Sequence, residues 1–210
     1  TTGTYGTFVG RYAGVYATTA SNSTFIGHDA GKSLEGTPLT GDNNTAVGKD
    51  AGLFLQGAAT NNTLVGKSSG GALETGSGNT FVGTLAGDST DDGANNTALG
   101  YGALSANCGD GNVAVGYGAL AANNTAIGIN SQVLVVGGFS NTSVGAYALQ
   151  TITTGDYNIG VGYNANSSSA GADGECTLGN TDISTLRCND TSISSLSDSR
   201  DKTDVVNSPY

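Results

Sequence analysis

Methionine and tryptophan are absent from this sequence, proline occurs twice, and charged residues make up only 11% of the 210 positions. No apolar run approaches the roughly 20 residues that a membrane-spanning helix requires, so we predict no membrane insertion. Glycine, asparagine, threonine and serine disfavour helix interiors, and no amphipathic helical pattern is present. The missing methionine and the lack of a signal peptide at Thr1 indicate a sequence that starts inside a longer protein.

Cysteine and histidine are too few and too irregularly placed for a metal centre or a catalytic constellation. The three cysteines, Cys108, Cys176 and Cys188, show no metal-site spacing and leave an odd one over. We interpret them as small, partly buried thiols, with an interchain link as the alternative. The single histidine, His28, is interpreted as a surface residue and not a catalyst. We therefore predict no cofactor and no enzymatic action on a substrate.

Acidic residues outnumber basic ones, 17 to 7, and the formal net charge is −10. A homotrimer would carry three times that charge, −30, which argues against nucleic acid or an anionic membrane surface as a partner. An acidic loop with Asp88, Asp91 and Asp92 offers oxygen ligands of the kind that Ca²⁺ takes. No ligand spacing recurs from loop to loop, so we interpret it as a solvated turn and predict no metal site.

The dominant feature is a repeat, of which Asn43 to Gly48 (NNTAVG) is one copy. Eleven copies align on their closing glycine, and all but two of the intervals between these glycines are 16 to 18 residues. The closing glycines are Gly10, Gly27, Gly48, Gly66, Gly83, Gly100, Gly116, Gly128, Gly145, Gly162 and Gly179. A steady period of this length predicts an all-β, parallel β-solenoid of about eleven repeats of ~17 residues.

Each repeat predicts one short strand ahead of its closing glycine. The residue before the glycine is always aliphatic, and the residue two places earlier is usually threonine, as in Thr45-Ala46-Val47. Positions two apart share a face of a strand, and we expect the Thr/Val face to form the inside of each coil. Coils rising ~4.8 Å each would give a rod on the order of 50 Å long.

Small and polar columns flank these strands. Alanine or serine recurs three residues after the glycine, which predicts a tightly packed corner in each coil. Asparagine precedes the strand in most repeats, and we expect these amides to form a hydrogen-bonded ladder. The asparagines are Asn44, Asn62, Asn79, Asn96, Asn112, Asn124, Asn141 and Asn158. The closing glycines fit a turn that requires positive φ or close backbone approach.

Three segments depart from the repeat. A longer loop runs from Lys32 to Asp42, and Val133 to Gly138 (VLVVGG) predicts an extra apolar strand. Beyond Gly179 the repeat stops, and Asp182 to Leu196 has the alternating apolar positions of a β stalk. We therefore predict a solenoid over 1–180, a stalk or connector over 181–196, and a third region over 197–210.

The residue directly after the closing glycine is the strongest candidate for binding. This column carries cations or histidine early in the chain and tyrosine later; the candidates are Arg11, His28, Lys49, Lys67, Tyr101, Tyr117 and Tyr163. Tyrosine faces stack on sugars, and cations pair with acidic glycans. A solvated edge would give the same pattern.

The repeats resemble known fibrous proteins. Asn96–Leu104 (NTALGYGAL) and Asn112–Leu120 (NVAVGYGAL) are similar to the head repeats of trimeric autotransporter adhesins and to repeats of phage and algal-virus fibre proteins. The resemblance covers about 1–180. It implies a homotrimer of left-handed parallel β-rolls, although the adhesin repeat is shorter. An intertwined triple β-helix, as in other tail-fibre shafts, is the alternative.

A second resemblance covers Leu178 to Val206. This stretch is similar to the junction that precedes the self-cleaving intramolecular chaperone domain of phage tail spikes and fibres of the endosialidase type, and Ser197, Asp198, Arg200 and Lys202 have that family's order and spacing. The resemblance implies that 197–210 begins a chaperone domain. It also implies self-cleavage between Ser197 and Asp198, with Lys202 as the base.

Together these features predict a structural and adhesive segment of a trimeric viral fibre, located on a virion surface or otherwise extracellular. The expected partners are two further copies of the chain, other fibre or virion proteins, and a host cell-surface glycan. A purely structural filament or spacer segment and a bacterial trimeric adhesin head are the alternatives. A bacterial adhesin would also be expected to have a heptad coiled-coil stalk, which this sequence lacks.

Overall fold

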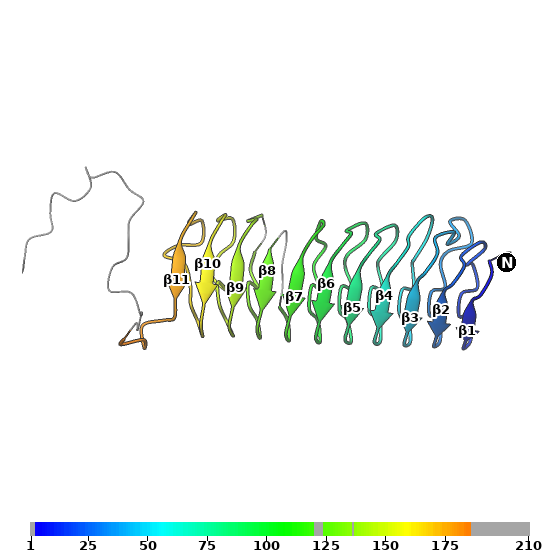
Figure 1. Cartoon of the computed structure of the whole chain (residues 1–210), viewed down its shortest axis with the longest axis horizontal. Helices are drawn as coiled ribbons and strands as arrows, with labels where there is room; N and C mark the ends of the chain where they lie inside the picture. The colour runs from blue at the N-terminus through cyan, green and yellow to red at the C-terminus, as the bar shows by residue number, and fades with distance from the viewer. Residues whose placement is uncertain (1–2, 120–123, 136, 186–210) are drawn as a thin grey trace, which may run out of the picture. The chain divides into compact units, whose positions relative to one another are not determined.

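The computed structural model describes residues 3–119, 124–135 and 137–185. These residues form an all-β solenoid with eleven parallel strands in one sheet, stacked in sequence order (Figure 1). The strands are β1 (Thr7–Val9), β2 (Thr24–Ile26), β3 (Thr45–Val47), β4 (Thr63–Val65), β5 (Thr80–Val82), β6 (Thr97–Leu99), β7 (Val113–Val115), β8 (Thr125–Ile127), β9 (Thr142–Val144), β10 (Ile159–Val161) and β11 (Cys176–Leu178). The predicted β-solenoid is confirmed, with one strand in each predicted repeat.

The strands pair in the register that the repeat predicts. Thr45 and Val47 of β3 lie opposite Thr63 and Val65 of β4, and every other neighbouring pair keeps the same alignment. Each strand therefore pairs with the preceding and following repeats of its own chain. This is the arrangement of a chain that coils on itself.

The closing glycines turn the chain out of the strand, as predicted. All eleven have positive φ, between 81° and 139°. At Gly48, a Cβ would lie 2.5 Å from the carbonyl oxygen of Gly66 in the next coil. A side chain at this position would thus collide with backbone that cannot move without breaking the stack.

The direction in which the strands face was predicted wrongly. The central residue of each strand points inward: Phe25, Leu64 and Phe81 are fully buried. The Thr/Val columns point outward, and the aliphatic side chains before the closing glycines are half-buried or exposed, up to 56% at Val9. Alternation shows which residues share a face but not which face is inside. A coil of this length has room for only one inward strand residue, so two of the three positions must face out.

The narrow interior is filled by complementary side chains. Coils with a large central residue have glycine four positions after the closing glycine, as at Phe81 and Gly87, where a Cβ would lie 2.4 Å from the Phe81 ring. The next coil has Ala98 in the strand and the buried Leu104 in place of that glycine. Leu104 keeps the left-handed backbone of Gly87, with φ of 56° against 61°. The same space is thus filled from either side of the coil.

The predicted asparagine ladder and small corner are confirmed. In the ladder, the backbone N–H of Asn96 donates to Oδ1 of Asn79, at 2.9 Å, and the Asn96 Oδ1 accepts from the backbone N–H of Asn112, at 2.8 Å. The Nδ2 of Asn96 donates to the carbonyl of Gly109, at 3.0 Å. The corner alanines, such as Ala86, are fully buried. Each buried amide therefore joins successive coils through both of its ends.

The predicted extra apolar strand is not found in the described residues, and only the first residues of the predicted stalk are described. Residues 131–134 form a turn and 135 has no regular structure, and Leu134 is 54% exposed, so the apolar run at 133–138 is a loop over the positions described there. Residues 181–182 form a turn and 183–185 contain no strand; the remainder of the predicted stalk lies outside the described residues. The solenoid lies within one compact unit, Thr1–Asn180.

Candidate functional site

The outward positions of the sheet form a continuous uncharged surface, which we call the sheet face. It consists of the first and third residues of β1 to β11, and every one of these residues is threonine, cysteine or aliphatic. Several of the aliphatic side chains are more than a third exposed: Val9, Ile26, Leu99, Ile127, Val144, Val161 and Leu178. A row of exposed apolar side chains of this length is characteristic of a surface that contacts another protein.

Beside the sheet face runs the column of residues that follow the closing glycines, which we call the post-glycine column. Its backbone is hydrogen-bonded from coil to coil: Asp29 N–H donates to Arg11 O, Asp50 N–H to His28 O and Ser68 N–H to Lys49 O, each at 2.9 Å. The predicted candidates Arg11, His28, Lys49 and Lys67 therefore lie on four successive coils. Tyr101 and Tyr117 lie on two later successive coils, and Tyr163 lies further along.

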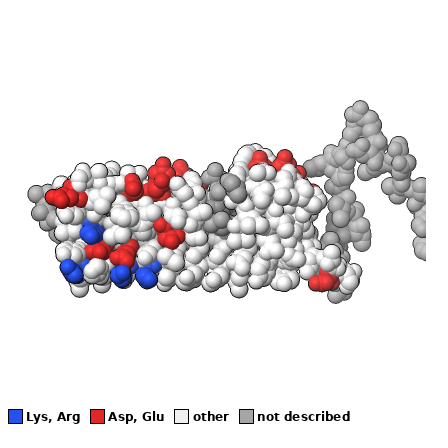
Figure 2. Space-filling view, turned by 180° about the vertical axis from the view of Figure 1, so that it is seen from behind, with Lys and Arg blue, Asp and Glu red and all other residues white. Residues whose placement is uncertain are grey.

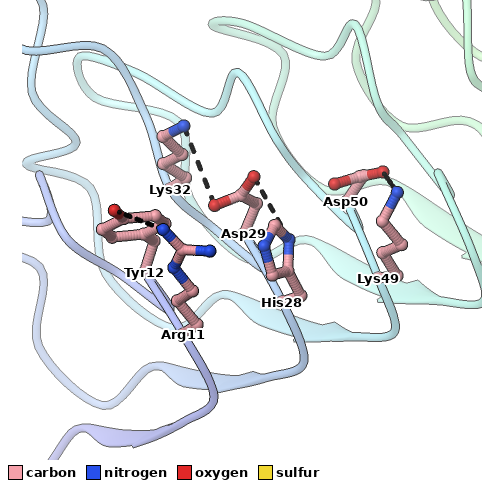
Figure 3. A network of polar contacts seen from close by, with 7 residues as sticks. All are labelled: Arg11, Tyr12, His28, Asp29, Lys32, Lys49 and Asp50. Atoms are coloured by element: carbon pink, nitrogen blue, oxygen red, sulfur yellow. Dashed lines mark hydrogen bonds and ion pairs between the residues drawn. The ribbon is translucent and has the colours of Figure 1, made fainter.

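The first coils of this column carry a polar network, which Figure 3 shows from close by. The Arg11 guanidinium lies 4.6 Å from the ring centroid of Tyr12, and Nη2 of Arg11 donates to the Tyr12 hydroxyl at 3.0 Å. His28 Nδ1 lies 3.3 Å from Asp29 Oδ2, and Lys32 Nζ lies 3.7 Å from Asp29 Oδ1. The network thus links residues of the first two coils through aromatic and ionic contacts.

Lys49 belongs to the next pair of the same network. Its Nζ lies 3.1 Å from Asp50 Oδ2, and its side chain is 60% exposed, against 21% for Asp50. Among the described residues, neither Arg11 nor Lys67 forms an ion pair. These two cations are therefore not neutralised by a carboxylate.

The same region contains the one cluster of potential metal ligands found in the described residues. Donor atoms of His28, Asp29 and Asp50 lie within 4.8 Å of one another. An imidazole with two carboxylates is a donor set that suits transition metals. Both carboxylates already pair with ammonium groups, Asp29 with Lys32 and Asp50 with Lys49, and a cation would have to displace them. The arrangement thus fits a network of ion pairs better than it fits a metal site.

The tyrosines of the column are exposed but partly occupied with one another. Tyr101 and Tyr117 stack at 5.4 Å between ring centroids with an interplanar angle of 9°, so each ring has one face covered by the other. Tyr163 lies edge-to-face with Tyr147 at 5.9 Å. Because stacking on a sugar requires a free aromatic face, this half of the column offers fewer sites than its exposure indicates.

Charge is divided along the solenoid. Figure 2 shows the Lys and Arg side chains gathered at one end with acidic side chains among them, while further acidic side chains lie along the opposite edge and beyond. Between positions 68 and 186 the sequence contains no lysine or arginine. The cationic side chains of the described residues are therefore confined to the first four coils.

The acidic loop is built as a turn. Asp91 Oδ1 accepts the backbone N–H of Asp92 at 2.8 Å, and hydrogen bonding of this kind, first to the backbone of Asp92, lowers the pKa of Asp91. Burial raises the pKa of Asp88, whose Oδ1 is buried without a hydrogen-bond partner. Asp88 and Asp91 thus differ in environment, and the acidic loop is not among the ligand clusters found in the described residues.

The cysteines are placed differently from one another. Cys108 is buried, with its Sγ 3.4 Å from Thr90 Oγ1, and burial raises the pKa of its thiol. Cys176 is exposed as the first residue of β11. Cys188 and the predicted self-cleavage residues Ser197 and Lys202 lie outside the described residues.

Four members of the network were not predicted: Tyr12, Asp29, Lys32 and Asp50. Tyr12, Asp29 and Asp50 follow the post-glycine column by one residue and have φ near 60°. A non-glycine residue with such a φ is uncommon and marks a position of interest. The sequence signal was the polar character of two adjacent columns, of which only the first was considered.

A search of protein-family models, of curated proteins and of solved structures found no match to this chain. In the part of the chain that the structure describes, no helix is long and apolar enough to span a membrane.

Proposed function

We propose that this chain is a structural and adhesive segment of a homotrimeric fibre of the viral type, which projects a receptor-binding surface toward a host cell. The observation that carries the proposal is the sheet face: an uncharged rank of outward aliphatic side chains that runs along all eleven strands. On a monomer such a face would be a liability, because flat and uncharged sheet surfaces associate readily.

The occupant that fits this face best is a second and a third copy of the chain. The face repeats every coil, rising ~4.8 Å per coil, and so presents a straight surface on the order of 50 Å long. Copies arranged in parallel around a common axis would place identical aliphatic ranks against one another over that length. Cyclic symmetry closes such a contact and leaves no unpaired face.

The trimer we propose consists of three self-contained β-rolls and not of an intertwined triple β-helix. The support is that each strand pairs with the neighbouring repeats of the same chain. In an intertwined helix, successive strands along the axis would come from different chains. The interior of each coil is also filled by its own side chains, such as Phe81 and Leu64, both fully buried.

A trimer of this kind suits a fibre that extends from a virion or another extracellular surface. The post-glycine column lies beside the sheet face, and the adhesive role requires that it stays accessible to a host glycan in the trimer. The alternative, a purely structural spacer, is supported by the mutual stacking of Tyr101 and Tyr117. Trimer formation is expected for both the adhesive segment and the spacer and does not distinguish them. A glycan array probed with the assembled protein does, because the adhesive role requires at least one glycan that binds.

Substitution of the sheet face tests the assembly. We expect Val65→Lys combined with Val82→Lys to yield monomers, because six ammonium groups would be buried at one axis without partners. The control is Val15→Lys, which adds a charge at an apolar residue that is 42% exposed but lies outside the strands. Unchanged assembly of the double variant, or loss of assembly in the control, would contradict the proposal.

A further inference from the structure

We infer that the first four coils of the post-glycine column bind a linear acidic polysaccharide, with Arg11 and Lys67 as unpaired cationic contacts and Lys49 as an exposed cationic contact that also pairs with Asp50. The inference rests on the proposed adhesive function and assigns its ligand class and its position. It divides the predicted column into a cationic half, which binds, and a tyrosine half, which does not carry the recognition.

The cations form a row and not a scattered set. Arg11, Lys49 and Lys67 occupy the same position of their coils, one step after the closing glycine, and the coil-to-coil backbone hydrogen bonds hold them in line. With His28 between Arg11 and Lys49, the row spans three coil steps, or about 15 Å. A chain of sugars with an acidic group on successive units presents its charges in the same linear manner.

The row keeps unneutralised positive charge on a protein that is otherwise acidic. Lys32 and Lys49 pair with Asp29 and Asp50, while Arg11 and Lys67 form no ion pair among the described residues. The net charge of the chain is −10, so a dispersed attraction for anions is not expected. Binding must therefore be local to these coils, where cation and anion contacts are charge-assisted.

The network also orders Arg11, the first cation of the row. The Arg11 guanidinium rests on the Tyr12 ring, and Lys32 Nζ lies 5.5 Å from the centroid of the same ring. Tyr12 and His28 are in edge-to-face contact at 6.4 Å. A side chain that is already ordered loses less entropy when it binds, which favours recognition over a merely solvated edge. Carboxylate and sulfate groups share the required chemistry.

The test is binding of the full chain to three immobilised polymers: dextran sulfate, polygalacturonate and uncharged dextran. We expect binding to one or both anionic polymers and none to dextran; the anionic polymer that binds identifies sulfate or carboxylate as the ligand group. Lys67→Ala and Lys49→Ala should each weaken binding by about two- to fivefold, the range for an exposed ion pair. The matched control, Tyr101→Ala with Tyr117→Ala, should leave binding unchanged.

Four results would overturn the inference: no binding to either anionic polymer, equal binding to dextran, loss of binding in the tyrosine control, or no effect of the two lysine changes. Lys67→Gln provides a second variant that keeps a polar side chain without the charge. Light scattering on the same samples separates the two proposals. A trimer that binds neither anionic polymer refutes the ligand assignment alone, whereas a monomer refutes the fibre proposal whether or not it binds.

Discussion

Exchange of the two side chains that fill one coil offers a sharp test of how the solenoid is packed. In the β5 coil the interior contains Phe81 and Gly87, and in the β6 coil it contains Ala98 and Leu104. We therefore consider the two changes that would give the β5 coil the alanine and leucine found in the β6 coil: Phe81→Ala and Gly87→Leu. The two single variants and the double variant form a double-mutant cycle.

Each single change should be costly, for opposite reasons. Phe81 is fully buried, and Phe81→Ala should lower the free energy of unfolding by about 3–5 kcal/mol through the cavity it leaves. Gly87→Leu should lower it by about 1–3 kcal/mol, because a Cβ there would lie 2.4 Å from two atoms of the Phe81 ring. A left-handed backbone at a non-glycine residue adds about 1–2 kcal/mol.

The double variant should lose less free energy of unfolding than the sum of the losses in the two single variants. The leucine side chain introduced by Gly87→Leu would occupy the space vacated by the ring, as Leu104 does beside Ala98. The φ near 60° that this position requires is one that Leu104 already adopts. We expect a favourable coupling free energy of at least about 2 kcal/mol, within the range seen for residues in contact. Urea unfolding followed by circular dichroism, at one fixed protein concentration, measures it.

The control pairs Phe81→Ala with Gly31→Leu. A Cβ at Gly31 would collide with Phe25, at 2.6 Å, and not with Phe81, so these two changes should be additive. Additive losses in the Phe81/Gly87 pair, or equal coupling in the control pair, would refute the idea that the side chains at positions 81 and 87 fill the same space inside the coil.

Three further predictions concern the ladder, the acidic loop and the C-terminal motif. Asn96→Ala should lower the free energy of unfolding by about 1–3 kcal/mol, measured by urea unfolding, because it leaves the buried N–H of Asn112 without its acceptor, while the Gly109 carbonyl keeps the hydrogen bond from Asn112 Nδ2. Burial raises the pKa of Asp88, so the folded state disfavours its charged form, and stability contributed by this group is lost as pH rises through the folded pKa. Asp88→Asn should therefore be more stable than wild type at neutral pH, by less than about 1 kcal/mol. Below about pH 3 the two proteins should be equally stable, because the side chain is neutral in both. Thermal unfolding at the two pH values should show this difference, and a constant difference would contradict it. For self-cleavage, expression of the chain with the downstream domain should give two fragments by mass spectrometry, whereas Ser197→Ala and Lys202→Ala should each leave one long chain; a wild type that stays whole would refute the reaction.

Much of the fold could be predicted because the repeat aligns every coil on one glycine. The strands, their parallel register, the asparagine ladder and the buried corner all follow from columns that recur at a steady interval. Gly48 illustrates this, since only glycine accommodates both its φ of 137° and the close approach of Gly66. These are local and nearest-neighbour properties, which a repeat specifies without reference to distant contacts.

The facing of the strands could not be predicted from alternation alone. Threonine and valine on the same face of a strand are equally compatible with a core and with a contact between chains. The complementary signal was present: Phe25, Leu64 and Phe81 are each followed by glycine at the corner, as expected if these side chains point inward. This signal is a correlation between two columns of the repeat, the central strand residue and the residue four places after the closing glycine. Alternation within a single strand does not reveal it.

The candidate site was predicted only in part, for a similar reason. Alignment on the glycines placed Arg11, His28, Lys49 and Lys67 in one column, and the structure brings them onto successive coils. The ion pairs with Asp29 and Asp50 depend on side-chain directions in the neighbouring column, which periodicity does not specify. Whether this surface binds a glycan stays a prediction.

The solution mass of the protein tests the central claim most directly. One chain has a mass of 20.6 kDa, and a homotrimer formed through the sheet face would have three times that mass, about 62 kDa. Multi-angle light scattering on the purified chain, over a range of concentrations, should give the trimer value throughout. A mass of 20.6 kDa at all concentrations would show that the sheet face is not a contact between copies of this chain, and would contradict the proposed fibre.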